Sequence, residues 1–468
     1  MGGIFGVISE KDCVEDLFYG TDYHSHLGTE FGGLAVKNAK DIKNKIHRIK
    51  NSPFRSKFND DLKELHGNSG IGVISDYEVQ PLLIRSHLGN YAVATVGRIN
   101  NQDELVKKIL TERKHLIEMS KGEVNPTELV ATLIAEKDSF EDGIAHAQEL
   151  INGSCTIILL TDNGIYAARD KAGRTPLIIG NKEGSYAVAS ETCSFHNCGF
   201  KIERDLGAGE IVFINKDGVQ QKKKPNSRKK ICSFLWIYYG NPSSTYEGIN
   251  VEEARHRCGA ALAKRDNIQV DVVAGIPDSG TAHAIGYANA KGVHFGRPAI
   301  KYVDTWQRSF MPQEQADRDV VAKMKLIYRK EQIDGKKILF CDDSIVRGTQ
   351  LKDNVKRIFD CGAKEVHVRP ACPPLCFGCK FLNFSRSKDE FDLAARTAIR
   401  ELEGKQIVTK EELDEYSNPD SEKYKKMVEK IKESLGVTTL QYQRLKDMIE
   451  AIGLPEEELC TYCWTGKE

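Results

Sequence analysis

The chain has 468 residues, and its 67 Lys and Arg residues balance its 67 Asp and Glu residues. This balance gives no reason to expect binding to nucleic acid or to a membrane surface. No apolar run approaches the length of a transmembrane helix, and residues 1–6 lack the features of a secretion signal. We therefore expect a soluble cytoplasmic protein of about two or three domains.

The first half of the chain has the pattern of a mixed α and β domain. Strands are expected at residues 4–8, 91–96, 155–160 and 211–214, and amphipathic helices at 103–110 and 126–135. A basic, proline-broken run at residues 222–230 indicates a linker or a surface excursion. It has no interleaved aromatic residues and so does not support nucleic-acid binding. We place a domain boundary there, which gives domains at residues 1–228 and 229–468.

In the second half, strands and helices alternate. Strands are expected at residues 270–276, 337–340 and 366–368, and helices at 281–290 and 350–359. Residues 385–435 are charged and helical in pattern. Alternation of this kind indicates a parallel sheet with its functional site at the carboxyl ends of the strands.

An apolar strand in the second half runs directly into two adjacent carboxylates. After Asp342 and Asp343 comes a short loop that leads into a helix, formed by Ser344, Ile345, Val346, Arg347, Gly348 and Thr349. Backbone N–H groups of such a loop and the helix N-terminus can hold a phosphate. The acidic pair can hold ribose hydroxyls and an oxygen-ligated Mg²⁺. The alternative is an ordinary turn with capping Asp and Ser residues, for which one carboxylate would suffice.

A second loop follows the neighbouring strand and contains Asp278, Ser279, Gly280 and Thr281. Its glycine suits close backbone approach to a pyrophosphate. The long segment between the two loops, with Arg308 and Lys325 near its ends, can close over a ligand and bring cations to a leaving group; the alternative is a plain surface loop. Displacement at the anomeric carbon of an activated ribose would then depend on positioning and charge neutralisation, without a protein nucleophile.

Several of these motifs occur in the same order along the chain as in a known family of enzymes. They are residues 272–280, Arg308-Ser309-Phe310, Lys323-Met324-Lys325-Leu326 and the acidic loop, together with residues 168–177 and 189–193 in the first half. The chain resembles the phosphoribosyltransferase family, and more closely the glutamine phosphoribosylpyrophosphate amidotransferase (amidophosphoribosyltransferase) family. The resemblance implies an N-terminal nucleophile-type αββα glutaminase domain followed by a type I phosphoribosyltransferase domain, and members commonly form homo-oligomers. The implied reaction transfers phosphoribosyl from phosphoribosyl pyrophosphate to ammonia, the first step of purine nucleotide synthesis.

The resemblance also assigns expected roles to the residues of the second half. The expected catalytic residues are Asp342, Asp343, Arg308 and Lys325. The expected Mg²⁺ ligands are Ser279 and the two carboxylates, Asp342 and Asp343. Phosphoribosyl pyrophosphate is expected on two loops, formed by Asp278, Ser279, Gly280 and Thr281 and by Ser344, Ile345, Val346, Arg347, Gly348 and Thr349.

Four of the thirteen cysteines form a further candidate site. The pair Cys460 and Cys463 is a CxxC motif, which alone is ambiguous between a redox dithiol, zinc and iron–sulfur. Cys232 and the group Cys372, Cys376 and Cys379 could supply two more ligands. The family resemblance selects Cys232 and Cys379 and implies a [4Fe–4S] cluster. A zinc site with four cysteine ligands is the runner-up, and unligated packing cysteines are the remaining alternative.

The expected glutaminase half departs from the family at its reactive positions. Gly2 stands where the family has its nucleophilic cysteine, and Ser75 where an arginine holds the glutamine carboxylate. Val96 replaces the asparagine that donates to the oxyanion, and Pro126 replaces a substrate-binding aspartate. Loss of the oxyanion donor alone commonly costs about a hundredfold to a thousandfold in rate. We therefore expect no glutamine hydrolysis by this half.

Three hypotheses follow for function. The first is an amidophosphoribosyltransferase-like enzyme that takes ammonia from solution or from a partner glutaminase. The second is a non-catalytic regulatory protein that binds phosphoribosyl pyrophosphate or purine nucleotides. The third is a phosphoribosyltransferase with a different amine acceptor. The intact acidic pair favours catalysis, because a nucleotide sensor has little need of both carboxylates.

Overall fold

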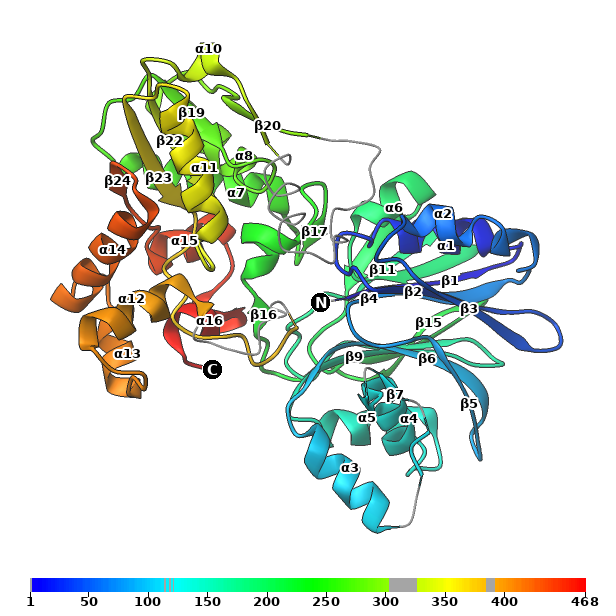
Figure 1. Cartoon of the computed structure of the whole chain (residues 1–468). Helices are drawn as coiled ribbons and strands as arrows, with labels where there is room; N and C mark the ends of the chain where they lie inside the picture. The colour runs from blue at the N-terminus through cyan, green and yellow to red at the C-terminus, as the bar shows by residue number, and fades with distance from the viewer. Residues whose placement is uncertain (1, 113–114, 118, 121, 303–325, 384–391) are drawn as a thin grey trace.

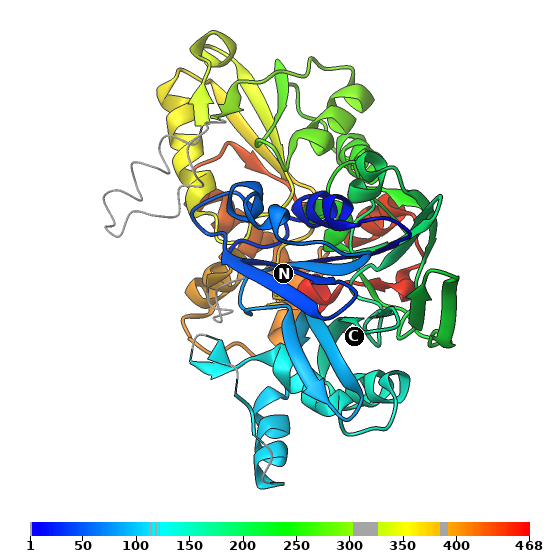
Figure 2. The same cartoon turned by 90° about the vertical axis from the view of Figure 1, so that its right-hand side faces the viewer.

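The computed structural model describes residues 2–112, 115–117, 119–120, 122–302, 326–383 and 392–468. Two antiparallel sheets form the centre of the first half, and the chain then continues into a parallel sheet with helices around it (Figure 1). Figure 2 shows the same arrangement turned by 90° about the vertical axis. The predicted sequence of an αββα domain and a phosphoribosyltransferase domain is confirmed.

The first half contains two sheets packed face to face. The first has seven strands in the order β13-β11-β12-β1-β4-β2-β3, and the second has six in the order β15-β14-β10-β9-β6-β5. The strands of the first sheet are β1 (Gly3–Ser9), β2 (Phe31–Lys37), β3 (Ile42–Arg48), β4 (Ser69–Ser75), β11 (Ile178–Lys182), β12 (Ser185–Ala189) and β13 (Lys201–Asp205). Those of the second are β5 (Leu82–Ser86), β6 (Gly89–Ile99), β9 (Gly153–Leu160), β10 (Ile165–Ala168), β14 (Ile211–Asn215) and β15 (Gly218–Lys223).

Helices cover the outer faces of both sheets (Figure 1). On the first sheet lie α1 (Val14–Asp22), α2 (Phe54–Phe58) and α6 (Cys193–Cys198), and on the second lie α3 (Gln102–Thr111), α4 (Pro126–Ile134) and α5 (Phe140–Leu150). Alternate residues of β9 divide between the two cores, as strand periodicity requires. Ile158 and Leu160 pack with the first sheet, whereas Ile157 and Leu159 pack with α4 and α5.

The second half is built on four parallel strands in the order β19-β22-β23-β24. They are β19 (Val272–Gly275), β22 (Lys337–Asp342), β23 (Glu365–Pro370) and β24 (Thr439–Leu440). Alternation in β22 again separates two cores. Leu339 and Cys341 pack with α7 (Val251–Lys264) and α8 (Thr281–Lys291), whereas Ile338 and Phe340 pack with α11 (Thr349–Asp360) and α14 (Glu422–Leu435).

The remaining elements of the second half are short. The helices are α10 (Lys330–Ile333), α12 (Ala394–Glu403), α13 (Lys410–Ser417), α15 (Leu445–Ile452) and α16 (Tyr462–Thr465). The strands β16 (Ile231–Cys232) and β25 (Leu459–Cys460) pair in parallel, which ties the C-terminal tail to the start of this half. The other two-stranded ribbons of this half are β17 (Thr245–Tyr246) with β18 (Ile249–Asn250), and β20 (Ala299–Lys301) with β21 (Leu326–Tyr328). One more ribbon, β7 (Met119–Ser120) with β8 (Glu123–Val124), lies in the first half.

The basic run at residues 222–230 follows the surface of the first half. Lys222 and Lys223 belong to β15, the N–H of Asn226 donates to the carbonyl of Ala208 (2.7 Å), and the N–H of Lys230 donates to that of Ala172 (2.8 Å). It is thus a hydrogen-bonded surface excursion and not an extended linker. No helix in the part of the chain that the structure describes is long and apolar enough to cross a membrane.

Candidate functional site

The two predicted sugar-phosphate loops meet at one edge of the parallel sheet. Gly275, at the end of β19, lies opposite Cys341 of β22. The hydroxyl of Ser279 in the first loop lies 3.5 Å from Oδ1 of Asp342 in the second. Gly280 makes this approach possible, because a Cβ at that position would lie 2.2 Å from the carbonyl oxygen of Cys341. The structure therefore brings together Ser279, Gly280 and the acidic pair.

The acidic pair is buried. Asp342 is 8% exposed and Asp343 is 6% exposed, although both are carboxylates. The backbone N–H of Asp343 donates to Oδ1 of Asp342 (2.9 Å), and the Ser344 hydroxyl donates to Oδ2 of Asp343 (2.5 Å). Burial, and then the charge of Asp343, raises the pKa of Asp342 well above its usual range, and burial also raises the pKa of Asp343. Two adjacent buried carboxylates fit the donor set of an oxygen-ligated Mg²⁺.

The remainder of the acidic loop leads into α11. Ile345 is buried, and the carbonyl of Val346 accepts from the N–H of Ala394 (2.7 Å). Arg347 pairs with Asp392 at 3.1 Å, so its guanidinium is engaged in this structure. Gly348 has φ of +79°, a conformation that glycine adopts without strain, and Thr349 begins the helix. The first turn of α11 thus presents its N–H groups at the end of the loop, as a phosphate site requires.

A cavity of about 400 Å³ opens beside the first loop. Its lining includes Asp278 and Thr281, together with Arg255 and Arg297, two cations that sequence reasoning missed. Arg255 is buried on α7 and donates to the carbonyls of Trp236, Tyr238 and Gly240. No motif marked this arginine, because only the packing of α7 against the sheet brings its charge close to that of Asp343.

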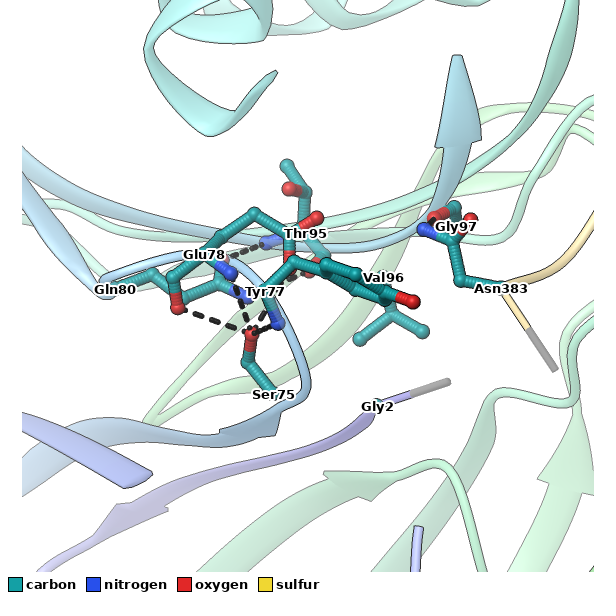
Figure 3. A pocket seen from close by; sticks show the side chains of 9 residues that line it. All are labelled: Gly2, Ser75, Tyr77, Glu78, Gln80, Thr95, Val96, Gly97 and Asn383. Atoms are coloured by element: carbon teal, nitrogen blue, oxygen red, sulfur yellow. Dashed lines mark hydrogen bonds between the residues drawn. The ribbon is translucent and has the colours of Figure 1, made fainter. Parts of the chain in front are cut away.

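A second, much smaller cavity lies in the first half (Figure 3). It holds about 10 Å³ and is lined by Gly2, Ser75, Tyr77, Glu78, Gln80, Thr95, Val96, Gly97 and Asn383. Three of the four expected glutaminase positions therefore meet here. Pro126 is not in the lining but begins α4, next to Thr127, whose hydroxyl donates to Oε1 of Gln80 (3.0 Å).

The backbone at Gly2 fits glycine and not a larger residue. A Cβ there would lie 2.6 Å from the carbonyl oxygen of Ile74 and 3.2 Å from a methyl of Val96. The first of these distances is closer than nonbonded Cβ atoms approach, and a backbone carbonyl cannot swing aside as a side chain can. A side chain at position 2 would therefore require movement of the surrounding backbone.

Comparisons with known proteins cover both halves. Residues 69–197 match the family described as a glutamine amidotransferase domain. The chain is 31% identical to the amidophosphoribosyltransferase of Bacillus subtilis (strain 168), with 99% of this chain and 93% of that protein covered. It is 30% identical to the amidophosphoribosyltransferase of Methanocaldococcus jannaschii, with 100% and 97% covered.

The chain belongs to the amidophosphoribosyltransferase family. A solved structure of the B. subtilis glutamine phosphoribosylpyrophosphate amidotransferase, complexed with ADP and GMP, superposes with a TM-score of 0.85 at 29% identity. That similarity covers 99% of this chain and 96% of the solved chain. The order of an amidotransferase domain and a phosphoribosyltransferase domain is therefore that of the family.

Within this family fold, the four predicted cysteines gather at the junction of β16, β25 and the segment before residue 384. Cys232 and Cys460 lie opposite each other in the parallel pair β16–β25. The Cys463 thiol, in hydrogen-bond contact, lowers the pKa of Cys379 to about 7. Arg174 of the first half donates to the sulfur of Cys460 (3.1 Å). Burial raises the pKa of Cys460, and the nearby Arg174 offsets part of that rise by favouring the thiolate, the form that binds iron or zinc.

The arrangement bears on which metal these thiols could hold. Among the residues that the structure describes, no group of three or more His, Cys, Asp or Glu side chains is arranged to hold a single metal ion. A [4Fe–4S] cubane places one thiolate on each of four iron atoms and so spaces the sulfurs more widely than one zinc ion does. Arg308 and Lys325 lie outside the described residues.

Proposed function

We propose that this chain transfers phosphoribosyl from phosphoribosyl pyrophosphate to ammonia, with release of pyrophosphate, and that it does not hydrolyse glutamine. The observation that carries the first part is the convergence of the Ser279 loop on the buried pair Asp342 and Asp343 at one sheet edge. That combination supports a site for a charged, phosphorylated sugar, because a buried carboxylate pair is costly unless a cation is bound.

In this reaction the ammonia nitrogen forms a bond to the anomeric carbon, the bond to the pyrophosphate oxygen breaks, and the nitrogen loses a proton to solvent. Asp342 and Asp343 would hold the ribose hydroxyls and Mg²⁺, which would neutralise charge on the pyrophosphate. The loop from Ser344 to Thr349, with the N-terminus of α11, would hold the 5′-phosphate. Asp278, Ser279, Gly280 and Thr281 would contact the pyrophosphate, with Ser279 also on the metal.

Two further side chains would complete the catalytic set. We infer that Arg308 and Lys325 bring positive charge to the leaving group, as their places in the family motifs imply. The cavity of about 400 Å³ beside Thr281 supports a ligand of nucleotide size at this edge. Arg255 and Arg297 would add to the positive charge of its walls.

The absence of glutaminase activity is proposed from the front cavity. At about 10 Å³ the cavity takes one water-sized molecule and not an amino acid. Gly2 supplies no nucleophile, Val96 no oxyanion donor and Ser75 no cation for a carboxylate. Ammonia would therefore come from solution or from a partner glutaminase.

We infer that Cys232, Cys379, Cys460 and Cys463 hold a [4Fe–4S] cluster with a structural role. The pairing of β16 with β25 and the stacking of Phe234 on Trp464 (5.0 Å) already join the tail to the rest of the half. A cluster would further stabilise this contact between the C-terminal tail and β16. Anaerobically purified protein should be brown, with about four iron and four sulfide per chain. A colourless protein with bound zinc would contradict this.

The second candidate function is regulatory binding of phosphoribosyl pyrophosphate or nucleotides, and the small volume of the front cavity, about 10 Å³, is the observation in its favour. A third is transfer to another amine. The deciding experiment measures pyrophosphate release from phosphoribosyl pyrophosphate and Mg²⁺ with ammonium chloride. We expect turnover that an Asp343→Asn variant lowers by about a hundredfold or more, whereas Asp360→Asn at the exposed end of α11 leaves it unchanged. Binding without ammonia-dependent turnover would favour regulation, and turnover with other amines only would favour the third candidate.

A further inference from the structure

A carboxylate lies in the small front cavity that no motif predicted. Glu78 follows the end of β4, and its side chain lines the cavity with Tyr77 and Val96 (Figure 3). The Ser75 hydroxyl donates to Oε2 of Glu78 (2.9 Å) and accepts from the N–H groups of Tyr77 (3.2 Å) and Glu78 (3.0 Å). Ser75, which stands where the family has an arginine, thus positions the carboxylate of Glu78. The cavity carries a negative charge where a glutamine site would carry a positive one.

The environment of Glu78 favours a bound cation. The side chain keeps some contact with the cavity, but the protein around it encloses the carboxyl, and this burial raises its pKa. Among the described side chains, no Lys, Arg or His forms an ion pair with Glu78 within 4.0 Å. The positive charge of the amino terminus lowers the pKa of the same carboxyl, so the terminal amine competes with any other cation for Glu78.

The size of the cavity limits what that cation can be. About 10 Å³ is the space that one water molecule occupies. Ammonium is a cation of this size with four N–H donors, whereas an amino acid or a guanidinium does not fit. Tyr77 also lines the cavity (Figure 3), and an aromatic ring attracts cations through its face.

Asn383 connects this cavity to the second half. Its side-chain amide donates to the carbonyl of Gly97 (3.2 Å) and lines the cavity from the phosphoribosyltransferase side. Two other hydrogen bonds join the halves nearby, from Arg98 to the carbonyl of Cys379 (2.8 Å) and from Asn100 to that of Lys380 (2.7 Å). The cavity therefore lies at the contact between the two halves and not on the far side of the first.

We propose that this cavity binds one ammonium ion on Glu78 and so holds the nitrogen donor at the boundary with the phosphoribosyltransferase half. The inference rests on the proposed function, because ammonium matters here only if ammonia is the acceptor. It assigns to the former glutamine pocket a new ligand class, a small monovalent cation with hydrogen-bond donors.

The first test is a calorimetric titration of the full chain with ammonium chloride, without phosphoribosyl pyrophosphate. Potassium chloride at the same ionic strength is the control, because potassium has a similar size and no N–H groups. We expect one saturable ammonium site with potassium at least tenfold weaker. Glu78→Gln and the cavity-filling Val96→Phe should each weaken ammonium at least tenfold. Glu457→Gln, an exposed and distant carboxylate, should leave it unchanged.

The second test is steady-state kinetics, with thermal unfolding to show that each variant is folded. Glu78→Gln should raise the KM for ammonium at least tenfold and leave the KM for phosphoribosyl pyrophosphate unchanged. Equal binding of potassium, no saturable ammonium binding, or binding only after acetylation of the terminal amine would each overturn the inference. Ammonium binding that depends on Glu78 without turnover would overturn the proposed function alone. Turnover that is indifferent to Glu78 would overturn this inference alone.

Discussion

At the scale of single residues, Asp342 and Asp343 form a binding site whose two carboxyl groups are unfavourable to bury without a ligand. Two carboxyl groups are buried side by side, and the pKa of each is raised, chiefly by burial. Serine hydroxyls contact both, but a hydroxyl only partly offsets the lost hydration of a carboxylate. The pair is therefore favourable only when protonated or when a cation is bound.

The first prediction concerns Asp342→Asn in the absence of ligands. A carboxyl with a raised pKa in the folded state binds more protons when folded than when unfolded. Its contribution to stability is therefore fully present below the usual Asp pKa of 3.8 and is lost as the pH rises through the raised pKa. Relative to the variant, the unmodified protein should lose stability from about pH 4 upward. At pH 7 the variant should be more stable by about 1–3 kcal/mol. Urea unfolding of both proteins across this range measures the difference.

Ligands should make the unmodified protein more stable than Asp342→Asn, the reverse of the order without ligands. With Mg²⁺ and phosphoribosyl pyrophosphate present, the unmodified protein should gain stability by mass action and the variant should gain little. Asp360→Asn, an exposed carboxyl on α11, serves as the charge-matched control and should track the unmodified protein. A stability difference between Asp342→Asn and the unmodified protein that does not change with pH would contradict the raised pKa.

At the scale of elements, the site depends on how closely the loop after β19 approaches the end of β22. The Cβ-free backbone of Gly280 lies against the carbonyl of Cys341, and α8 begins at the next residue. The contact sets the distance between Ser279 and the acidic pair. A displacement of about 1 Å in such loops is enough to spoil the alignment of a transferring group.

The second prediction is that Gly280→Ala separates these two loops. Its Cβ would lie 2.2 Å from a backbone carbonyl, which must move because no side chain can yield. We expect a loss of about a hundredfold in kcat for pyrophosphate release and a cost of about 1–3 kcal/mol in unfolding free energy. Steady-state kinetics and urea unfolding measure the two effects.

The matched control for Gly280→Ala is Ala290→Ser, at an exposed position near the other end of α8. It should change neither activity nor stability beyond about 0.5 kcal/mol. Full activity in Gly280→Ala would show that the close contact between the loops does not position the site.

The strands and helices were predictable from the sequence where periodicity is strong. Residues 155–160 and 337–340 lie within the strands β9 and β22, and the helix expected at 350–359 lies within α11. The parallel sheet followed from the alternation of elements. Glu78 and Arg255 were not predictable, because neither lies in a motif and each gains its surroundings only from contacts distant in sequence.

The same limit applies to the basic run at residues 222–230. Its composition is that of a linker, yet its backbone hydrogen bonds go to Ala172 and Ala208, which a local pattern cannot show. The expected domain boundary at residue 228 remains a prediction.

At the scale of the whole molecule, the two halves differ in what they retain. The second half keeps a buried acidic pair, a phosphate-type loop and a cavity of about 400 Å³. The first half keeps its fold and its contacts to the second, but its cavity beside Gly2 and Val96 holds about 10 Å³.

The last prediction tests this division with glutamine as the only nitrogen source. Purified protein with phosphoribosyl pyrophosphate and Mg²⁺ should release neither glutamate nor pyrophosphate above the level without enzyme. An unrelated glutaminase added to the same mixture should start pyrophosphate release, because it supplies ammonia. Gly2→Cys should not restore glutamate release, since its Cβ would lie 2.6 Å from the Ile74 carbonyl and neither Ser75 nor Val96 replaces the missing contacts. Glutamate release by the unmodified chain, or its recovery in Gly2→Cys alone, would show that the first half still works as a glutaminase.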